Sequence, residues 1–242
     1  MTQTLQDFNV AILVMDGFEE VELTDPRDAL RAQGARTVIV SARHGDVQGM
    51  RHHDKGERVQ VDLTFAQARA EADRFDAVLL PGGVVNADEI RLHPDARELV
   101  RALHEAGKPV AVICHGAWLL ISAGLVKDRK MTSWPSLADD LRNAGAQWVD
   151  EEVVVDGRWI SSRKPDDIPA FNRELLRVFA LARPERQRVQ RGADREPPGR
   201  ATRSVFTGER HARTSVFARS AEAGADSARL AAGRPAGRSG HR

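Results

Sequence analysis

Residues 108–124 read KPVAVICHGAWLLISAG, and this stretch decides the fold. The apolar, valine-rich run over 108–114 predicts a strand that is buried on both faces. The second apolar run, after Gly116, predicts a helix, so the chain changes from strand to helix at Cys114. A buried strand followed at once by a helix is typical of the βα units of a parallel sheet.

The same alternation continues on both sides of this stretch. We expect strands over 9–15, 35–42, 59–63 and 75–83, and turns over 45–56. We expect helices over 18–34, 93–107, 116–124, 136–145 with Ser136 as N-cap, and 165–180, and a hairpin through Asp156-Gly157. The predicted fold class is α/β, with a mostly parallel sheet joined by right-handed crossovers and covered on both faces.

The 242 residues divide into two unlike parts. Residues 183–242 contain 14 arginines, no lysine and 6 acidic residues, whereas residues 1–182 contain 22 basic and 29 acidic residues. We therefore predict an α/β domain over 1–181, long enough to bury a sizeable core, and a disordered tail rich in Arg, Ala and Gly over 182–242. The tail carries few aromatic residues, so a solvated and even non-native extension is favoured over a nucleic-acid-binding arm.

The single cysteine excludes an intramolecular disulfide and fits a reducing cytoplasm, where we expect the protein. The N-terminal residues lack the basic and small-residue features of a signal peptide. No apolar stretch approaches the ~20 residues of a membrane span. We expect no membrane partner.

Polar or glycine-rich segments follow three of the predicted strands. They are 16–20, 81–83 and 114–116. In open parallel sheets, ligands bind beyond the carboxyl ends of the strands, so these segments predict the site.

Cys114 has two interpretations. A strand, then Cys114, His115 and Gly116, then a helix resemble a nucleophile elbow, which lifts the cysteine side chain into the crevice. The helix N-terminus favours the thiolate. A lone cysteine after an apolar strand is also commonly a small buried hydrophobe.

Two further strand ends support the first interpretation. Gly82 and Gly83, with the N–H of His115 opposite, offer backbone N–H groups to a developing oxyanion, although the glycines alone would mark only a turn. Glu19 could hydrogen-bond the Cys114 thiol, or could be one of the first-turn helix acids, as Glu20 and Glu22 would be.

The remaining candidates are weaker. His44, His52, His53 and Asp54 fit no zinc pattern, so we predict no metal site. Trp118, just after the elbow, is a candidate for the pocket lining and otherwise belongs to the core or an interface.

Several motifs together closely resemble the PfpI family of intracellular cysteine peptidases and deglycases, which is related to class I glutamine amidotransferases. They are DGFEEVEL (16–23), LLPGG (79–83), AVICHGAWLLISAGL (111–125), TSWPSL (132–137), NAGAQWVDEEVVVDG (143–157) and SSRKPDDIPAFNREL (161–175). The resemblance covers about residues 9–180 and leaves the tail out. It implies a flavodoxin-like three-layer sandwich with a nucleophile elbow.

The resemblance also implies roles for individual residues. Cys114 would be the nucleophile, His115 its partner, and Glu19 the acid that contacts the thiol. The third member of the triad would be an acid from a neighbouring subunit, Asp88 by position with Glu89 as the alternative, so the protein would be a homo-oligomer. Family members commonly have Glu there, so Asp88 is a departure.

Two functions from different classes follow. The first is a cysteine hydrolase without cofactor, a peptidase or a glyoxalase-like deglycase of glyoxal adducts in stress protection. The second is a stress chaperone or peroxide sensor that uses an oxidisable Cys114. The amidotransferase reaction is excluded, because no histidine follows His115 until His211, and the distant base is therefore missing.

Overall fold

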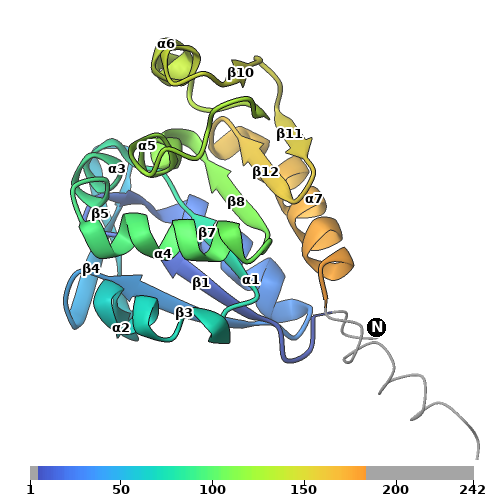
Figure 1. Cartoon of the computed structure of the whole chain (residues 1–242). Coiled ribbons are helices and arrows are strands. Elements are labelled where there is room, and N and C mark those ends of the chain that lie inside the picture. The colour runs from blue at the N-terminus through green and yellow to red at the C-terminus, as the bar shows by residue number, and fades with distance from the viewer. Residues whose placement is uncertain (1–4, 184–242) are drawn as a thin grey trace, which may run out of the picture. The chain divides into compact units, whose positions relative to one another are not determined.

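The computed structural model describes residues 5–183, drawn in colour in Figure 1. The strands are β1 (Asn9–Leu13), β2 (Phe18–Glu19), β3 (Arg36–Ser41), β4 (Gly45–Arg51), β5 (Asp54–Val61), β6 (Leu63–Thr64), β7 (Ala77–Leu80), β8 (Val110–Ile113), β9 (Lys130–Met131), β10 (Gln147–Trp148), β11 (Val153–Asp156) and β12 (Trp159–Ser162). The α-helices are α1 (Glu20–Ala32), α2 (Phe65–Ala70), α3 (Val84–Ile90), α4 (Pro94–Glu105), α5 (Ala117–Ser122), α6 (Ala138–Asn143) and α7 (Ile168–Leu181).

The central sheet has seven strands in the order β11-β12-β8-β7-β1-β3-β6. All neighbouring pairs are parallel except β11 and β12, which form the hairpin expected at Asp156-Gly157. The predicted α/β class with a mostly parallel sheet is therefore confirmed. β8, from the deciding stretch, lies near the middle of the sheet, between β12 and β7.

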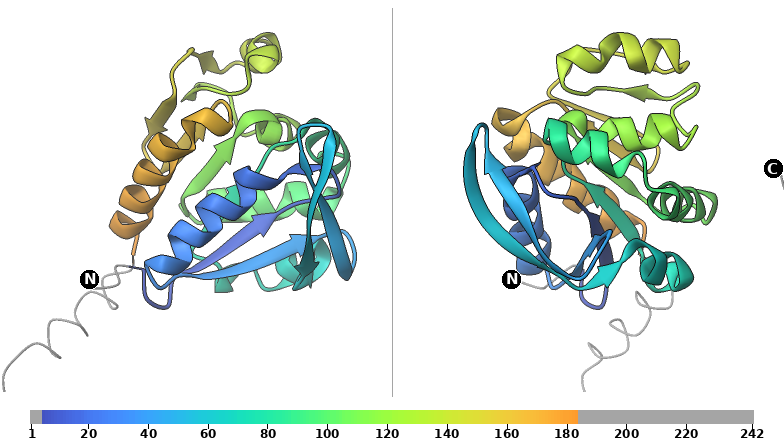
Figure 2. Two further views of the ribbon diagram at one scale, coloured as in Figure 1. Left: turned by 180° about the vertical axis from the view of Figure 1, so that it is seen from behind. Right: turned by 90° about the vertical axis from the view of Figure 1, so that its left-hand side faces the viewer.

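Helices cover both faces of this sheet (Figures 1 and 2). On one face α2, α4 and α5 bury apolar side chains such as Phe65 and Leu99 against alternate strand residues. On the other face α1 and α7 do the same, with Leu30 and Phe171 fully buried. Successive strand residues point to opposite faces, so one buried strand contributes to both cores: Val112 to the first and Ile113 to the second.

The largest correction concerns the segment between β3 and α2. The sequence predicted turns over 45–56 and a short strand over 59–63, whereas β4 and β5 form one long antiparallel hairpin. β2 pairs in parallel with β4, so the three strands make a second, smaller sheet. The hairpin curves along one side of the molecule (Figure 2, right) and packs Val47, Val59 and Val61 into the core. Most of its other residues are exposed and polar, so its sequence lacks a clear strand pattern.

Two helices differ from prediction. α3 occupies the segment after Gly83, for which the sequence predicted no helix. The helix predicted to begin at Ser136 starts instead as a 3-10 turn, Pro135–Leu137, so Ser136 lies inside that turn and is not the N-cap of α6. No helix within 5–183 is long and apolar enough to cross a membrane. All but the first two residues of the predicted tail, 182–242, lie outside the described residues.

Candidate active site

Cys114 lies at the sharp turn between β8 and α5. It begins a 3-10 helix, Cys114–Gly116, and its backbone φ is 60°, a left-handed value. That conformation costs a residue with a side chain roughly 1–2 kcal/mol. Strained backbone of this kind concentrates at functional sites, and it supports the elbow interpretation over that of an ordinary core cysteine.

Glycine at 116 allows this turn to approach the neighbouring strand. A Cβ atom there would lie 2.6 Å from the carbonyl oxygen of Leu80 and 3.0 Å from that of Pro81. Both distances are shorter than van der Waals contact. The elbow therefore requires a residue without a side chain at this position.

His115 is placed to exchange a proton with the Cys114 thiol. Its Nδ1 lies 3.2 Å from Sγ of Cys114, and its ring stacks on Trp134 and meets Trp118 edge to face. Burial lowers the pKa of His115 to about 4, so the imidazole is neutral at pH 7. A neutral imidazole at this distance can accept the thiol proton.

Glu22 is the acid at the thiol. Its Oε2 accepts a hydrogen bond of 2.7 Å from the N–H of Gly82, and the carboxyl group interacts with the Cys114 thiol. Burial raises the pKa of Glu22 to about 8; the hydrogen bonds from Gly82 and Cys114 oppose this rise, and the charge of Glu19 adds to it. At neutral pH most molecules therefore hold a protonated Glu22, which can donate to sulfur.

The Cys114 sulfur is desolvated as well. Burial raises the pKa of the thiol, and an ionised Glu22 raises it further, whereas the backbone N–H groups of His115 and Gly83 lower it. Protonation of Glu22 removes the repulsion. At neutral pH the site therefore holds a thiol beside a neutral imidazole that can accept its proton.

The same two N–H groups form the candidate oxyanion hole. Gly83 has a φ of 88°, and a Cβ there would lie 2.3 Å from the carbonyl oxygen of Gly17. The amide of Asn86 fixes this turn by donating to the carbonyl oxygens of Pro81 and Gly82. The N–H of Gly82 is already bonded to Glu22, so Gly83 and His115 are the available donors.

Cys114 opens into a cavity of about 700 Å³ at the carboxyl ends of the strands. The cavity is lined by Gly17, Glu19, Glu22, Met50, His52, His53, Gly83, Val84, Val85, Cys114, His115, Trp134 and Pro165. Its walls are largely apolar, and β1, β7, β8 and the β4–β5 hairpin each place residues on or next to it.

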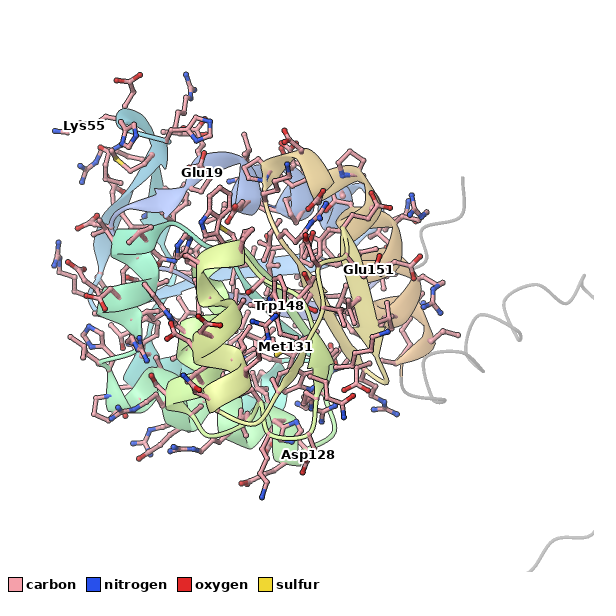
Figure 3. The ribbon with its side chains drawn as sticks, turned by 90° about the horizontal axis from the view of Figure 1, so that it is seen from above. Glu19, Lys55, Asp128, Met131, Trp148 and Glu151 are labelled. Atoms are coloured by element: carbon pink, nitrogen blue, oxygen red, sulfur yellow. The ribbon has the colours of Figure 1, made fainter. Side chains whose placement is uncertain are left out.

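Two predicted roles are corrected. Glu19 was expected at the thiol, but Glu22 makes that contact, because β2 delays the start of α1 to Glu20 and turns Glu22 inward. Trp118 was expected to line the pocket, but Trp134 does, while Trp118 Nε1 donates to Asp140 at 2.8 Å. Glu19 still lies on the cavity wall, next to the hairpin that carries Lys55 (Figure 3).

Asp88 and Glu89 stand apart from this cavity. Both are exposed on α3, and neither lines the cavity in the described part of the chain. The third triad member therefore stays a prediction that concerns a second subunit.

Sequence reasoning overlooked several residues of the site. Glu22 could have been considered from the sequence, because it lies three residues after Glu19 and residues at this spacing share a helix face. No sequence pattern pointed to three other positions. Asn86 reaches the site through the turn after β7, Trp134 through a loop, and His52 and His53 through the β4–β5 hairpin, which the sequence did not predict. Within residues 5–183, no three His, Cys, Asp or Glu side chains are grouped so as to hold a metal ion.

Comparisons with known proteins find relatives that match most of residues 5–183. The model of the DJ-1/PfpI family matches residues 8–178. A deglycase of Thermococcus kodakarensis is 46% identical over 171 residues, which cover 70% of this chain and 98% of that protein. Protein/nucleic acid deglycase 2 of Escherichia coli is 39% identical over 173 residues, which cover 70% of this chain and 96% of that protein.

Solved structures share the fold. A two-domain protein of Anabaena variabilis with DJ-1/ThiJ/PfpI-like and ferritin-like domains is 35% identical, with a TM-score of 0.66, and the match covers 70% of this chain and 47% of that one. DJ-1beta of Drosophila melanogaster is 28% identical, with a TM-score of 0.64, and the match covers 80% and 98% of the two chains.

Proposed function

Because this chain belongs to the DJ-1/PfpI family, we propose that it is a cysteine-dependent deglycase and glyoxalase that acts on glyoxal-derived adducts in stress protection. One observation carries the proposal. Cys114, on a strained elbow, lies 3.2 Å from a neutral imidazole and beside a protonated carboxyl group, at the base of an apolar cavity. These are a nucleophile, a base and an acid in contact.

The first step transfers the adduct carbon from nitrogen to sulfur. For a methylglyoxal adduct of an amine, Sγ of Cys114 forms a bond to the carbon that carries the amine nitrogen and a hydroxyl, and the carbon–nitrogen bond breaks. His115 takes the thiol proton and passes it to the departing amine. The products are the free amine and a hemithioacetal on Cys114.

The second step needs no external oxidant. The proton on the sulfur-bearing carbon moves to the neighbouring carbonyl carbon, so the first carbon is oxidised and the second is reduced. The N–H groups of Gly83 and His115 stabilise the negative oxygen that develops, and Glu22 and His115 carry the protons. Water then hydrolyses the resulting thioester to lactate and returns the Cys114 thiol.

A second subunit would complete the site. Val84, Val85 and Leu92 are large exposed apolar side chains on and just after α3, with Leu92 71% exposed. Surfaces of this kind favour contact with another protein chain, here a second copy. Such a contact would allow Asp88 of one copy to approach the His115 imidazole of the other, as the family resemblance implies.

The peroxide-sensor alternative has less support. Oxidation by peroxide follows thiolate character and exposure, whereas Cys114 is 6% exposed and burial raises the pKa of its thiol. Reversible sulfenate formation at low peroxide, without turnover of any substrate, would favour the sensor.

The proposed function is tested by a substrate panel with the full-length protein. Methylglyoxal, a methylglyoxal-treated amine and casein are compared in wild type and Cys114→Ala. We expect the wild type to turn over the first two, with lactate as product, and the variant to lose both activities. Hydrolysis of casein alone would contradict the deglycase and favour a peptidase.

A further inference from the structure

Trp118 contacts the imidazole of His115 from outside the cavity. It follows His115 by three residues, a spacing that places two side chains on one face of a helical turn. The two ring centroids are 5.3 Å apart, and the rings meet edge to face at an interplanar angle of 65°. His115 lines the cavity, whereas Trp118 does not. The proposed reaction gives Trp118 no role.

The indole of Trp118 is held at its edge and on its face. Its Nε1 donates to Oδ2 of Asp140 on α6 at 2.8 Å. The guanidinium group of Arg91, the residue after α3, lies over the indole at 5.3 Å from the ring centroid. Arg91 is itself fixed, because its Nε donates to Oγ of Ser122 at 2.9 Å. A hydrogen bond to a charged group and a cation–π contact therefore give the indole a defined orientation.

The imidazole of His115 depends on aromatic contacts for its own orientation. In the described part of the chain, the one side-chain atom that hydrogen-bonds the ring is Sγ of Cys114, 3.2 Å from Nδ1. The other ring contacts are with Trp118 and with Trp134, which stacks at 5.8 Å. A rotation of 180° about the bond to Cβ would put a ring carbon in the place of Nδ1 and end the contact with sulfur. The two indoles resist this rotation.

We propose that Trp118 is a positioning residue, whose indole keeps Nδ1 of His115 toward the Cys114 sulfur and shields the imidazole from water. The inference rests on the proposed function, in which His115 takes the thiol proton. Trp134 also stacks on the imidazole, but it is 37% exposed and lies on the cavity wall. Trp118 is the indole that a hydrogen bond to Asp140 fixes outside the space that substrate enters.

Shielding by Trp118 has a measurable consequence for His115. Burial lowers the pKa of the imidazole to about 4. The charged or titratable groups on the elements that surround it are Glu19, Glu22, Asp88, Arg91, Cys114 and Asp140. Arg91 and Asp140 have opposite charges, and both contact the indole of Trp118. Loss of that indole should admit water to the imidazole and raise its pKa toward the ordinary value near 6.5.

The pKa of His115 in the folded protein tests the proposal without any substrate. It is measured by NMR titration of the full-length protein labelled with 15N-histidine, and His115→Gln identifies the signal. We expect the pKa in Trp118→Ala to lie at least about 1 above that in wild type. Trp118→Phe keeps an aromatic ring at this position and should lie close to wild type. An unchanged pKa in folded Trp118→Ala would overturn the proposal.

Asp140→Ala decides the question if Trp118→Ala does not fold, because Asp140 is exposed on α6. Release of the indole should raise the pKa of His115, whereas loss of a negative charge alone would lower it. Asp139→Ala is the matched control, because Asp139 is the adjacent exposed acid and pairs with Arg142 instead. It should leave the pKa unchanged. A pKa that does not rise in Asp140→Ala, or an equal rise in both variants, would contradict the proposal.

Turnover separates positioning from substrate binding. Trp118 does not line the cavity, so Trp118→Ala should lower kcat for methylglyoxal by about tenfold and leave KM unchanged. A higher KM with unchanged kcat would overturn the positioning role. A wild type that turns over no substrate would contradict the proposed function, while the titration of His115 would still decide for or against Trp118.

Discussion

The Oε2 of Glu22 accepts a hydrogen bond of 2.7 Å from the N–H of Gly82, and this bond joins the first turn of α1 to the turn after β7. It holds the carboxyl group against Cys114, which lies at the end of a third element, β8. Three segments far apart in the sequence thus meet at the Cys114 thiol.

The rate should depend on pH through both partners of Cys114. Attack needs a neutral His115, with a pKa of about 4, and a protonated Glu22, with a pKa of about 8. We expect a bell-shaped pH profile of kcat/KM for methylglyoxal. In Glu22→Gln the alkaline limb should disappear and the maximal rate should fall by about tenfold to a hundredfold. An alkaline limb that persists unchanged in this variant would show that another group causes it.

The stability of the fold should respond to the same carboxyl group. In the unfolded chain the pKa of Glu22 returns to its ordinary value near 4.5, while in the fold it is about 8. Between these values the folded protein keeps a proton that the unfolded chain releases. The contribution of Glu22 to stability is therefore present below about pH 4.5 and is lost as the pH rises through 8.

Urea unfolding of wild type and Glu22→Gln at several pH values measures this effect. We compare the free energy of unfolding of wild type with that of Glu22→Gln. The difference, wild type minus variant, should fall as the pH rises from 5 to 8, by at most about 1.4 kcal/mol per pH unit. A constant difference across this range would mean that the carboxyl group is not protonated in the fold.

Gly116→Ala tests the steric basis of the elbow. The new Cβ would meet the Leu80 carbonyl oxygen, so we expect a loss of about 1–3 kcal/mol in the free energy of unfolding and a large loss of kcat. Gly124→Ala is the control, because Gly124 has a positive φ of 72° that alanine adopts at a cost, while its Cβ would meet no atom within 4 Å and the residue is outside the cavity lining. It should lose about 1 kcal/mol and keep its kcat. Equal kinetic losses in both variants would point to general destabilisation.

Mixed oligomers test the shared site. Cys114→Ala and Asp88→Ala proteins are each expected to be impaired, but a mixture that exchanges subunits should recover part of the activity, because some interfaces combine two intact partners. Glu89→Ala replaces Asp88→Ala in a parallel mixture to decide between the two acids. Without recovery in oligomers shown to be mixed, the cross-subunit acid would have to be abandoned.

The elements around the deciding stretch could be predicted from the sequence because they are local. The buried runs of β1, β7 and β8 and the Cys114 elbow follow from apolar period and glycine positions, and the family resemblance is confirmed. The exact acid at the thiol could not be predicted. α1 begins two residues later than predicted, and this shift places Glu22 instead of Glu19 at the thiol. Helix boundaries predicted from sequence are uncertain by about 2–4 residues.

The other omissions arise from long-range contacts. The β4–β5 hairpin pairs with a two-residue strand, β2, so most of its residues are solvent-exposed and carry no apolar alternation. Trp134 reaches the site because its backbone N–H donates to the Cys114 carbonyl oxygen at 3.3 Å, a contact that joins a loop to the 3-10 helix after β8. Neither the hairpin nor the position of Trp134 can be predicted from the residues of its own segment alone.

The central claim is that Cys114 is the nucleophile, and its replacement tests this most directly. Full-length Cys114→Ala is compared with wild type for methylglyoxal consumption and lactate formation, with circular dichroism to show that the fold is retained. We predict a loss of kcat/KM of about a thousandfold or more. A folded Cys114→Ala protein that keeps wild-type kcat/KM would contradict the account.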